Sequence, residues 1–364
     1  MKLTRILGLT ATVAIAAAAC SGSATTTPSP AASAAASAAA SPAASASAAA
    51  SPAASASAAG TASDYTPPTE AGAAAGKTIA IISKGEQHQF WQAVKKGALD
   101  EATKLGVTAT YQGPATESEV DKQITMLQTA LSSNPAAVCF AALDSKAAGS
   151  LLQQAKDANI PVVGFDSGVD SDIPVTTVAT DNIAAAGVAA DKVAELIGDA
   201  GKVGVIVHDQ TSQTGITRRD GFVNQMAAKH PNIQVVDVQY GAGDPVKSAD
   251  IAKSMMTANP DLKAFFGANE GSIKGVLNAL KETGNENKIV AVGYDSGQQQ
   301  LDAITSGVEA GAITQNPVGI GAKCVDAAVD AINGKDIPKN IDTGFYWFDK
   351  TNINDPEIQA VLYK

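Results

Sequence analysis

Apolar and polar positions follow a regular rhythm from Lys77 onward. Short runs of β-branched or apolar residues begin at Thr78, Thr108, Ala136 and Pro161, and the stretches between them carry apolar residues at helical spacing. A strand followed by a covering helix is the repeating unit of a parallel sheet. The pattern therefore predicts an α/β lobe that begins near residue 77.

The same rhythm starts again after residue 180, with strand-like runs at Lys202, Gln234, Lys263 and Lys288. Because a single hydrophobic core stops growing at roughly 250–300 residues, we predict two similar lobes, each a parallel sheet flanked by helices. Later strand-like runs lead the chain back from one lobe to the other. We therefore predict a hinge that the chain crosses several times. The predicted lobes are residues 77–180 with 316–345, and residues 181–315 with 346–364.

The first residues of the chain show the pattern of a secretory signal. Lys2 and Arg5 precede an apolar run, and small residues follow up to residue 19. A basic start, a short apolar centre and small residues at the end are typical of a cleaved signal peptide rather than of a permanent membrane helix. We therefore predict that residues 1–19 are a signal peptide.

The segment Ala-Ala-Ala-Cys that ends at Cys20 resembles the lipobox of bacterial lipoproteins, in which the cysteine thiol carries a lipid. Ala17 stands where leucine is usual in that motif. The resemblance implies lipid attachment at Cys20. The alternative is ordinary secretion with an incidental cysteine.

Alanine, serine, proline and threonine dominate the chain from Cys20 to residue 76. No charged residue lies between Arg5 and Asp64, and the segment SPAASASAA occurs at Ser41 and again at Ser51. Such a composition builds no core, and serine and proline interrupt alanine helices. We therefore predict that residues 20–76 comprise the lipid-bearing cysteine and a disordered tether.

Charge and cysteine usage narrow the classes of partner and fold. The net charge of −10 argues against nucleic acid and anionic lipid surfaces as partners. Cys139 and Cys324 lie in apolar patterns of different predicted elements. Distant cysteines seldom meet the geometry of a disulfide, so we predict that both are buried and reduced. The alternative is a disulfide between them, which an oxidising compartment would allow.

Signatures of enzymes, cofactors and metals are missing from the sequence. No GxGxxG follows a strand, no GxSxG is present, and the three histidines, His88, His208 and His230, have no metal-ligand spacing. The segment GAAAGKT at Gly72 is one residue short of a phosphate loop and precedes a strand. We therefore expect no cofactor, no metal site and no enzymatic activity.

Polar residues end most of the predicted strands. Ligands of open parallel sheets bind beyond the carboxyl ends of the strands, so these positions are the first candidates for a site. They are Ser83, Lys84, Asp144, Asp166, Ser167, His208, Asp209, Asn269, Glu270, Asp295 and Gln315. Directional amides and carboxylates suit sugar hydroxyls, although Asp166 and Asp295 would also suit the acid and base of a glycosidase.

Phe90 and Trp91 add an aromatic face to these polar candidates. They are adjacent at the start of the first predicted helix, so at most one ring points fully into the core. The other ring can face the cleft, where it would pack against the C–H side of a sugar. The alternative is that both rings are core anchors.

Longer segments resemble one family over nearly the whole chain from Lys77 to Lys364. They include HQFWQAVKKGALDEATKLGV, DSGVDSDIP, TRRDGF, FFGANEGSIKGVLNAL and AVGYDSGQQQ. In order and spacing they are similar to the sugar-binding proteins of bacterial ABC importers, of the ribose- and galactose-binding type. The resemblance implies the type I periplasmic-binding-protein fold, in which two lobes close around a ligand.

The resemblance implies a set of ligand-binding residues in the N-terminal lobe. The aromatic residues of the family at the first helix correspond to Phe90 and Trp91, and His88 stands where a ligand-contacting asparagine is common. The acidic residue after the fourth strand corresponds to Asp166. The arginine that follows it in ribose binders is Ser167 here, a departure that argues against ribose.

The C-terminal lobe keeps the ligand-binding pattern of the family at Arg218, Asn269, Asp295 and Gln315. Arg218 can pair with Asp166 or Asp295, so that no charge is buried alone. The family also carries an aromatic residue after the strand that begins near Gln234. This chain lacks it, because the sequence there is GAGD. The resemblance therefore implies a pocket that lacks one stacking wall.

From these patterns we expect an extracytoplasmic, monomeric lipoprotein that attaches to the cell membrane only through its lipid. It would capture a monosaccharide or related polyol between its lobes and deliver it to the permease of an ABC transporter. No covalent chemistry is involved. The alternative is a sensor for a sugar or furanosyl signal that presents its closed form to a receptor.

Overall fold

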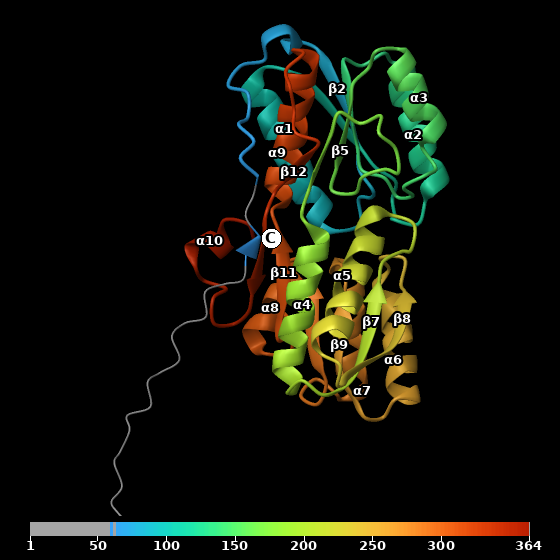
Figure 1. The fold of residues 1–364 in the computed structure, drawn as a ribbon, viewed down its shortest axis with the longest axis vertical. Coiled ribbons are helices and arrows are strands. Elements are labelled where there is room, and N and C mark those ends of the chain that lie inside the picture. The colour runs from blue at the N-terminus through green and yellow to red at the C-terminus, as the bar shows by residue number, and fades with distance from the viewer. Residues whose placement is uncertain (1–58, 61–62, 364) are drawn as a thin grey trace, which may run out of the picture. The chain divides into compact units, whose positions relative to one another are not determined.

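Two separate sheets organise the part of the chain that the structure, a computed structural model, describes: residues 59–60 and 63–363. Figure 1 shows the two sheets in two lobes, each with helices on both faces. The predicted signal peptide and Cys20 lie outside the described residues. The expectation of two α/β lobes flanked by helices is confirmed, with sheets whose strands are mostly parallel.

The sheet of the first lobe has six parallel strands in the order β12-β6-β5-β4-β2-β3. The strands are β2 (Thr78–Ile82), β3 (Thr108–Gln112), β4 (Ala137–Phe140), β5 (Val162–Phe165), β6 (Thr176–Ala179) and β12 (Asn340–Asp342). The flanking helices are α1 (Gln89–Leu105), α2 (Val120–Ser132), α3 (Gly149–Asp157) and α9 (Pro317–Ile332). Helices α1 and α9 cover one face, and α2 and α3 cover the other.

The sheet of the second lobe has seven strands in the order β1-β13-β11-β10-β9-β7-β8, of which β13 is antiparallel to both neighbours. The strands are β1 (Ala59–Gly60), β7 (Gly201–Val207), β8 (Ile233–Tyr240), β9 (Leu262–Gly267), β10 (Val290–Tyr294), β11 (Gly311–Gln315) and β13 (Phe345–Phe348). The helices are α4 (Asn182–Ile197), α5 (Gln213–Lys229), α6 (Pro245–Ala258), α7 (Glu270–Thr283), α8 (Gln298–Ser306) and α10 (Pro356–Gln359).

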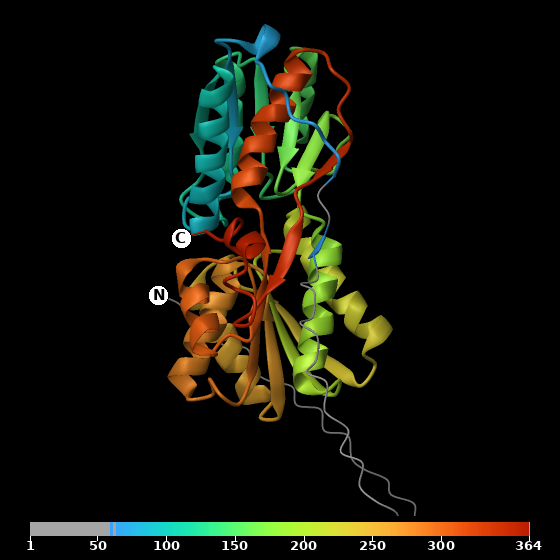
Figure 2. The ribbon, with the colours of Figure 1, turned by 90° about the vertical axis from the view of Figure 1, so that its left-hand side faces the viewer.

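The chain passes between the two sheets between β6 and α4, between β11 and α9, and between β12 and β13. Figure 2 shows these connections on one side of the molecule. Several short connections of this kind allow two rigid lobes to rotate as bodies. The three connections thus hold the ends of the two sheets against each other and form the hinge between the lobes.

The closest helix contact in the first lobe is made by α1 and α9. A Cβ atom on Gly97 would lie 2.0 Å from the Val318 carbonyl oxygen, and one on Gly321 would lie 2.0 Å from the Val94 carbonyl oxygen. Only glycine fits at such a distance. This contact brings the late helix α9 back onto the first sheet, next to α1 (Figure 2).

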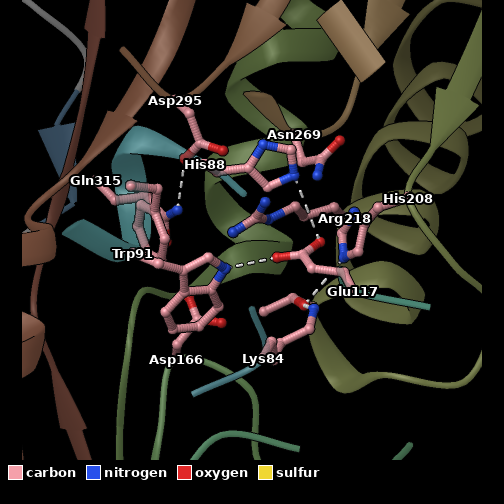
Figure 3. Close-up of a pocket in the computed structure, with 12 residues that line it drawn as sticks. Lys84, His88, Trp91, Glu117, Asp166, His208, Arg218, Asn269, Asp295 and Gln315 are labelled. Atoms are coloured by element: carbon pink, nitrogen blue, oxygen red, sulfur yellow. Dashed lines mark hydrogen bonds and ion pairs between the residues drawn. The ribbon is translucent and has the colours of Figure 1, made fainter. Parts of the chain in front are cut away.

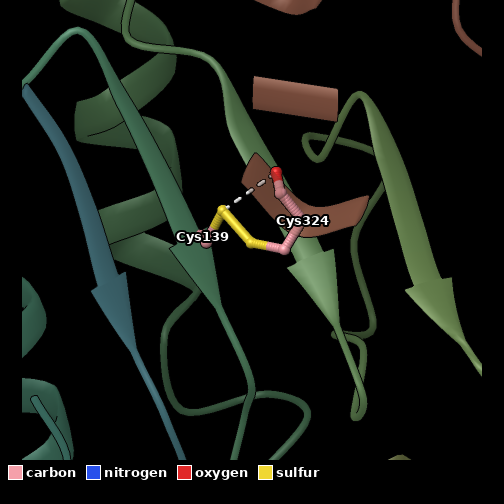
Figure 4. Close-up of a disulfide and its surroundings, with 2 residues drawn as sticks. All are labelled: Cys139 and Cys324. Atoms are coloured by element: carbon pink, nitrogen blue, oxygen red, sulfur yellow. Dashed lines mark hydrogen bonds between the residues drawn. A yellow bond between two sulfur atoms is a disulfide. The ribbon is translucent and has the colours of Figure 1, made fainter. Parts of the chain in front are cut away.

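Cys139 of β4 and Cys324 of α9 form a disulfide, with a Cα–Cα distance of 6.3 Å (Figure 4). The prediction of two reduced cysteines is therefore wrong. The two residues are 185 positions apart in sequence, but α9 packs directly on β4 after the chain has built the second lobe. Both side chains are buried in the core of the first lobe.

Residues 63–76, which the sequence assigns to the tether, pack against the first lobe. The Tyr65 hydroxyl donates to Asp330 Oδ2 over 2.7 Å, and the Ala73 amide donates to Asn333 Oδ1 over 2.7 Å. The segment that resembles a phosphate loop thus contains a short 3₁₀ turn, η1 (Gly72–Ala74), held by Asn333. The ordered part of the chain begins earlier than the composition predicts.

Candidate ligand-binding site

One cavity lies where the strand ends of both sheets meet. Figure 3 shows its lining side chains. Every ligand-binding residue predicted from the sequence lines it, namely His88, Phe90, Trp91, Asp166, Arg218, Asn269, Asp295 and Gln315. Lys84, Glu117, His208 and Thr214 complete the lining. The space around these side chains that is not filled by atoms, open solvent included, is about 270 Å³.

Asp166 and Asp295 follow directly on β5 and β10, with φ of 55° and 83°. Few residues other than glycine adopt this left-handed region, and aspartate and asparagine tolerate it best. The backbone amide of Asp166 donates to the Val178 carbonyl and that of Asp295 donates to the Ile313 carbonyl. Each carboxyl group therefore sits on a sharp strand end that is tied to the neighbouring strand.

Asp295 is the centre of a hydrogen-bond network in the second lobe. Gln315 Nε2 donates to its Oδ1 over 2.7 Å, and the Glu270 amide donates to its Oδ2 over 2.9 Å. Burial raises the pKa of Asp295, while Arg218 and the Gln315 bond act to lower it. The network fixes the orientation of both the carboxyl group and the amide of Gln315.

Arg218, on α5, is only 3% exposed. Its Nε donates to Asn182 Oδ1 over 2.7 Å, its Nη1 donates to the Ala268 carbonyl over 2.9 Å, and its guanidinium lies 3.8 Å from the centre of the Tyr294 ring. Among the described residues, Arg218 forms no ion pair with Asp166 or Asp295, so the expected pairing is wrong. Its charge acts on both carboxyl groups through space.

The aromatic wall belongs to the first lobe. Phe90 and Trp91 both line the cavity, and their rings meet edge to face with centroids 5.0 Å apart. Trp91 also packs edge to face on Phe165. Both rings are buried, so the cavity and the core share the same pair of side chains.

Lys84 lies just beyond β2 and His208 just beyond β7, and both side chains contact the Thr214 hydroxyl of the second lobe. Lys84 is 2% exposed, and its Nζ lies 3.1 Å from Thr214 Oγ1 and 3.8 Å from Asp209 Oδ2. Burial, followed by the charge of Lys84, lowers the pKa of His208 to about 3, so this imidazole is neutral. Both residues stood among the strand-end candidates, but the resemblance gave them no role. Thr214 and Glu117 carried no signal in the sequence.

A comparison with known proteins agrees with this geometry. The sequence profile described as "Periplasmic binding protein domain" matches residues 79–336. The chain belongs to this family. It is 30% identical to the ribose import binding protein of Escherichia coli K12 over 272 residues, which cover 73% of this chain and 88% of that protein. It is 29% identical to the D-allose-binding periplasmic protein of the same organism over 275 residues, with the same coverage.

Solved structures give the same result. A carbohydrate transporter solute-binding protein from Agrobacterium radiobacter, in complex with D-arabinose, superposes with a TM-score of 0.77 at 31% identity over 79% of this chain and 99% of that chain. A solute-binding protein from Agrobacterium vitis with bound D-fucose gives a TM-score of 0.76 at 33% identity over 79% and 100%. The predicted membership of the type I periplasmic binding proteins is thereby confirmed.

Family membership decides between two of the earlier alternatives. The relatives are binding components of sugar importers and carry out no reaction, so this chain is a binding protein rather than a glycosidase. Within residues 59–60 and 63–363, no helix has the length and apolar character needed to cross a membrane.

Proposed function

We propose that this chain is an extracytoplasmic substrate-binding lipoprotein that captures a monosaccharide or related polyol and delivers it to an ABC transporter permease. The observation that carries the proposal is the cavity into which polar groups of both sheets converge beside Phe90 and Trp91. Amides, carboxylates and a guanidinium held in fixed directions suit a ring of adjacent hydroxyl groups. The aromatic pair suits the apolar side of such a ring.

Hydrogen bonds that span the cleft support capture by lobe closure. Glu270, at the start of α7, accepts hydrogen bonds from the backbone amides of Phe90 and Gln89, over 3.2 and 3.4 Å. The Ser145 amide donates to the Thr211 carbonyl over 3.0 Å. We propose that two bodies rotate apart to admit the ligand and that this rotation breaks the hydrogen bonds across the cleft. The bodies are residues 77–180 with 316–345, and residues 181–315 with 346–364.

The ligand that suits the cavity is neutral. Glu117, Asp166 and Asp295 face Lys84 and Arg218 around the same space, so an added anion would meet an excess of negative charge. Two relatives are named for ribose and allose, and two similar solved structures hold D-arabinose and D-fucose, all uncharged monosaccharides. Ser167 in place of the arginine of ribose binders favours a sugar other than ribose.

We further propose that residues 1–19 direct export and that Cys20 carries the lipid, so that the chain touches the membrane only there. The binding domain would work as a monomer at the end of its tether, close to the permease. Labelling of Cys20 with a radioactive fatty acid in cells, and its loss in Cys20→Ala, would be the expected outcome. Release of wild-type protein in soluble form without label would contradict the anchor.

The binding proposal is tested by thermal unfolding of the purified protein in a panel of pentoses, hexoses and polyols. A ligand that binds only the folded state stabilises it by about 2.7 kcal/mol at a hundredfold excess over its dissociation constant. We expect a clear rise of the unfolding midpoint with one sugar or a small related group. A folded protein that responds to no member of the panel would contradict the proposal.

A further inference from the structure

Glu117 is a cavity residue that neither the strand ends nor the resemblance identifies. It lies in the loop between β3 and α2, and its side chain is buried, with 8% of the residue exposed. Trp91 Nε1 donates to Glu117 Oε1 over 2.7 Å. Glu117 Oε2 is buried and has no hydrogen-bond partner. Figure 3 shows the carboxyl group among the side chains that line the cavity.

The nearest candidate partner of this oxygen is already engaged. His88 Nε2 lies 4.0 Å from Glu117 Oε2, too far for a hydrogen bond. Gln87 Nε2 lies 2.8 Å from the same His88 nitrogen and 3.2 Å from the Gly243 carbonyl oxygen. The amide of Gln87 thus contacts both the imidazole of His88 and the Gly243 turn of the second lobe.

The position of the Glu117 loop is fixed from both lobes. The Glu117 amide donates to Gln87 Oε1 over 3.2 Å, so one glutamine orients the loop, the imidazole and the Gly243 turn together. Gly243 has a φ of 65°, and a Cβ atom there would lie 3.0 Å from Glu117 Oε2 and 3.3 Å from His88 Nε2. Glycine thus allows the second lobe to close directly over this carboxyl group.

The free oxygen carries a cost that a ligand would remove. Burial acts to raise the pKa of Glu117, while the charge of Lys84 and the hydrogen bond from Trp91 act to lower it. The charge of Lys84 thus favours the ionised form of this carboxyl group, which is a hydrogen-bond acceptor. A buried carboxylate oxygen without a donor is unfavourable. Lys84 itself is held by Thr214 and Ser212 on the other lobe.

We infer that Glu117 is a specificity-determining residue of this site, whose Oε2 accepts a hydrogen bond from one hydroxyl group of the bound sugar. The inference rests on the proposed function and names the class of ligand more narrowly. The cavity selects a neutral monosaccharide that carries a hydroxyl group at this position. It discriminates against the deoxy sugar that lacks it, and against sugar phosphates and sugar acids, whose charge Glu117 repels.

Calorimetric titrations test the inference with wild type, Glu117→Gln and the control Glu119→Gln. Glu119 lies in the same loop, where it bonds to Lys122 and to the Thr116 amide and does not line the cavity. The probes are D-ribose, D-arabinose, D-xylose, D-galactose, D-allose and D-tagatose. For the tightest binder the series adds its monodeoxy analogues, its uronic acid where one exists, and its terminal phosphate.

We expect Glu117→Gln to bind the parent sugar about 10- to 100-fold more weakly than wild type, since a hydrogen bond to a charged group is lost. Glu119→Gln should bind like wild type. One deoxy analogue should bind wild type and Glu117→Gln with equal affinity. The hydroxyl group that this analogue lacks is then the one that Glu117 contacts. The charged analogues should bind wild type more weakly than the parent sugar.

Three results would overturn the inference while the proposed function stands: Glu117→Gln within twofold of wild type on the parent sugar, an equal loss in Glu119→Gln, or a charged analogue that binds tighter than its parent. The same holds if every deoxy analogue loses affinity by the same factor in both forms. If wild type binds none of the sugars, the proposed function fails, and the inference fails with it.

Discussion

The two walls of the cavity are built differently. In the second lobe the polar groups hold one another: Gln315 donates to Asp295, Arg218 donates to Asn182, and Asn269 caps α7 by accepting from the Ser272 amide. In the first lobe two aromatic rings stand beside Glu117, which keeps one oxygen without a partner. The second lobe therefore offers a preorganised frame, and we infer that the first lobe offers the groups that distinguish one ligand from another.

The largest effect should come from breaking the frame. Arg218→Met removes a buried charge and leaves Asn182 Oδ1 and the Ala268 carbonyl without this donor. We expect a loss of about 3–5 kcal/mol in the free energy of unfolding, because two hydrogen bonds of a buried charged group, each worth about 1.5–3 kcal/mol, are lost, and no detectable sugar binding. Urea unfolding measures the loss of stability, and calorimetric titration measures the loss of sugar binding. Arg219→Met is the matched control, since the neighbouring side chain is partly exposed and bonds to Asp220. Equal effects in the two variants would contradict the frame.

The second effect concerns the scaffold of the first lobe. Replacing Cys139 and Cys324 together by alanine opens a disulfide that closes a loop of 185 residues. We expect a loss of about 2–5 kcal/mol in the free energy of unfolding, measured by thermal and urea unfolding. The disulfide lies in the core behind the cavity wall, so sugar affinity should change by less than about threefold. A large loss of affinity with little loss of stability would reverse this assignment.

The third effect is a pH dependence at the cavity. Burial raises the pKa of Asp166 to about 6, although Lys84 and Arg218 act to lower it. Below that pH the carboxyl group is neutral and loses an acceptor for the ligand, so affinity should fall about tenfold between pH 7 and pH 5. The stability of the unliganded protein changes with pH in the opposite direction to the affinity. Because the folded pKa lies above the unfolded value, this group destabilises the folded state above about pH 6, and the cost disappears as pH falls toward 4. Asp166→Asn should flatten both profiles, and unchanged slopes would refute the assignment.

The smallest effect lies on the surface of the second lobe. His230 bonds to Asp191 over 2.9 Å and to Asp199 over 2.6 Å, and the bond to Asp191 contributes most to raising its pKa. A raised pKa stabilises the fold below the unfolded value near 6.5, and the contribution is lost as pH rises through the folded pKa. The two aspartates are 42% and 54% exposed, although His230 is only 17% exposed, so solvent screens the pairs and we expect less than about 1 kcal/mol. His230→Gln should remove this slope without altering sugar affinity, as thermal unfolding from pH 6 to 8 would show.

Much of the fold follows from the sequence because the period of the apolar residues is local. The runs at Thr78 and Ala136 became β2 and β4 within a few residues. The disulfide and the α1–α9 contact were not predictable in this way, because they depend on the return of the chain after the second lobe is complete. Residues 63–76 pack through Tyr65 and Asn333, isolated contacts that a composition rich in alanine conceals.

The cavity shows the same division. Strand ends and the family pattern predicted the residues of the frame, since parallel strands bring their carboxyl ends together whatever the side chains are. Arg218 lines the cavity, but its expected partners were wrong, because Asn182 and the Ala268 carbonyl come from a crossing and a strand end far apart in sequence. Glu117 was missed because a loop glutamate has no periodicity and gains its role only through Trp91 and Gln87.

Isothermal titration calorimetry of the folded wild-type protein with the neutral monosaccharide panel tests the central claim most directly. We predict that wild type binds one sugar per chain with a saturable heat signal and that Arg218→Met gives no saturable heat signal. Absence of binding to every sugar by the folded wild type, or wild-type binding by Arg218→Met, would contradict it.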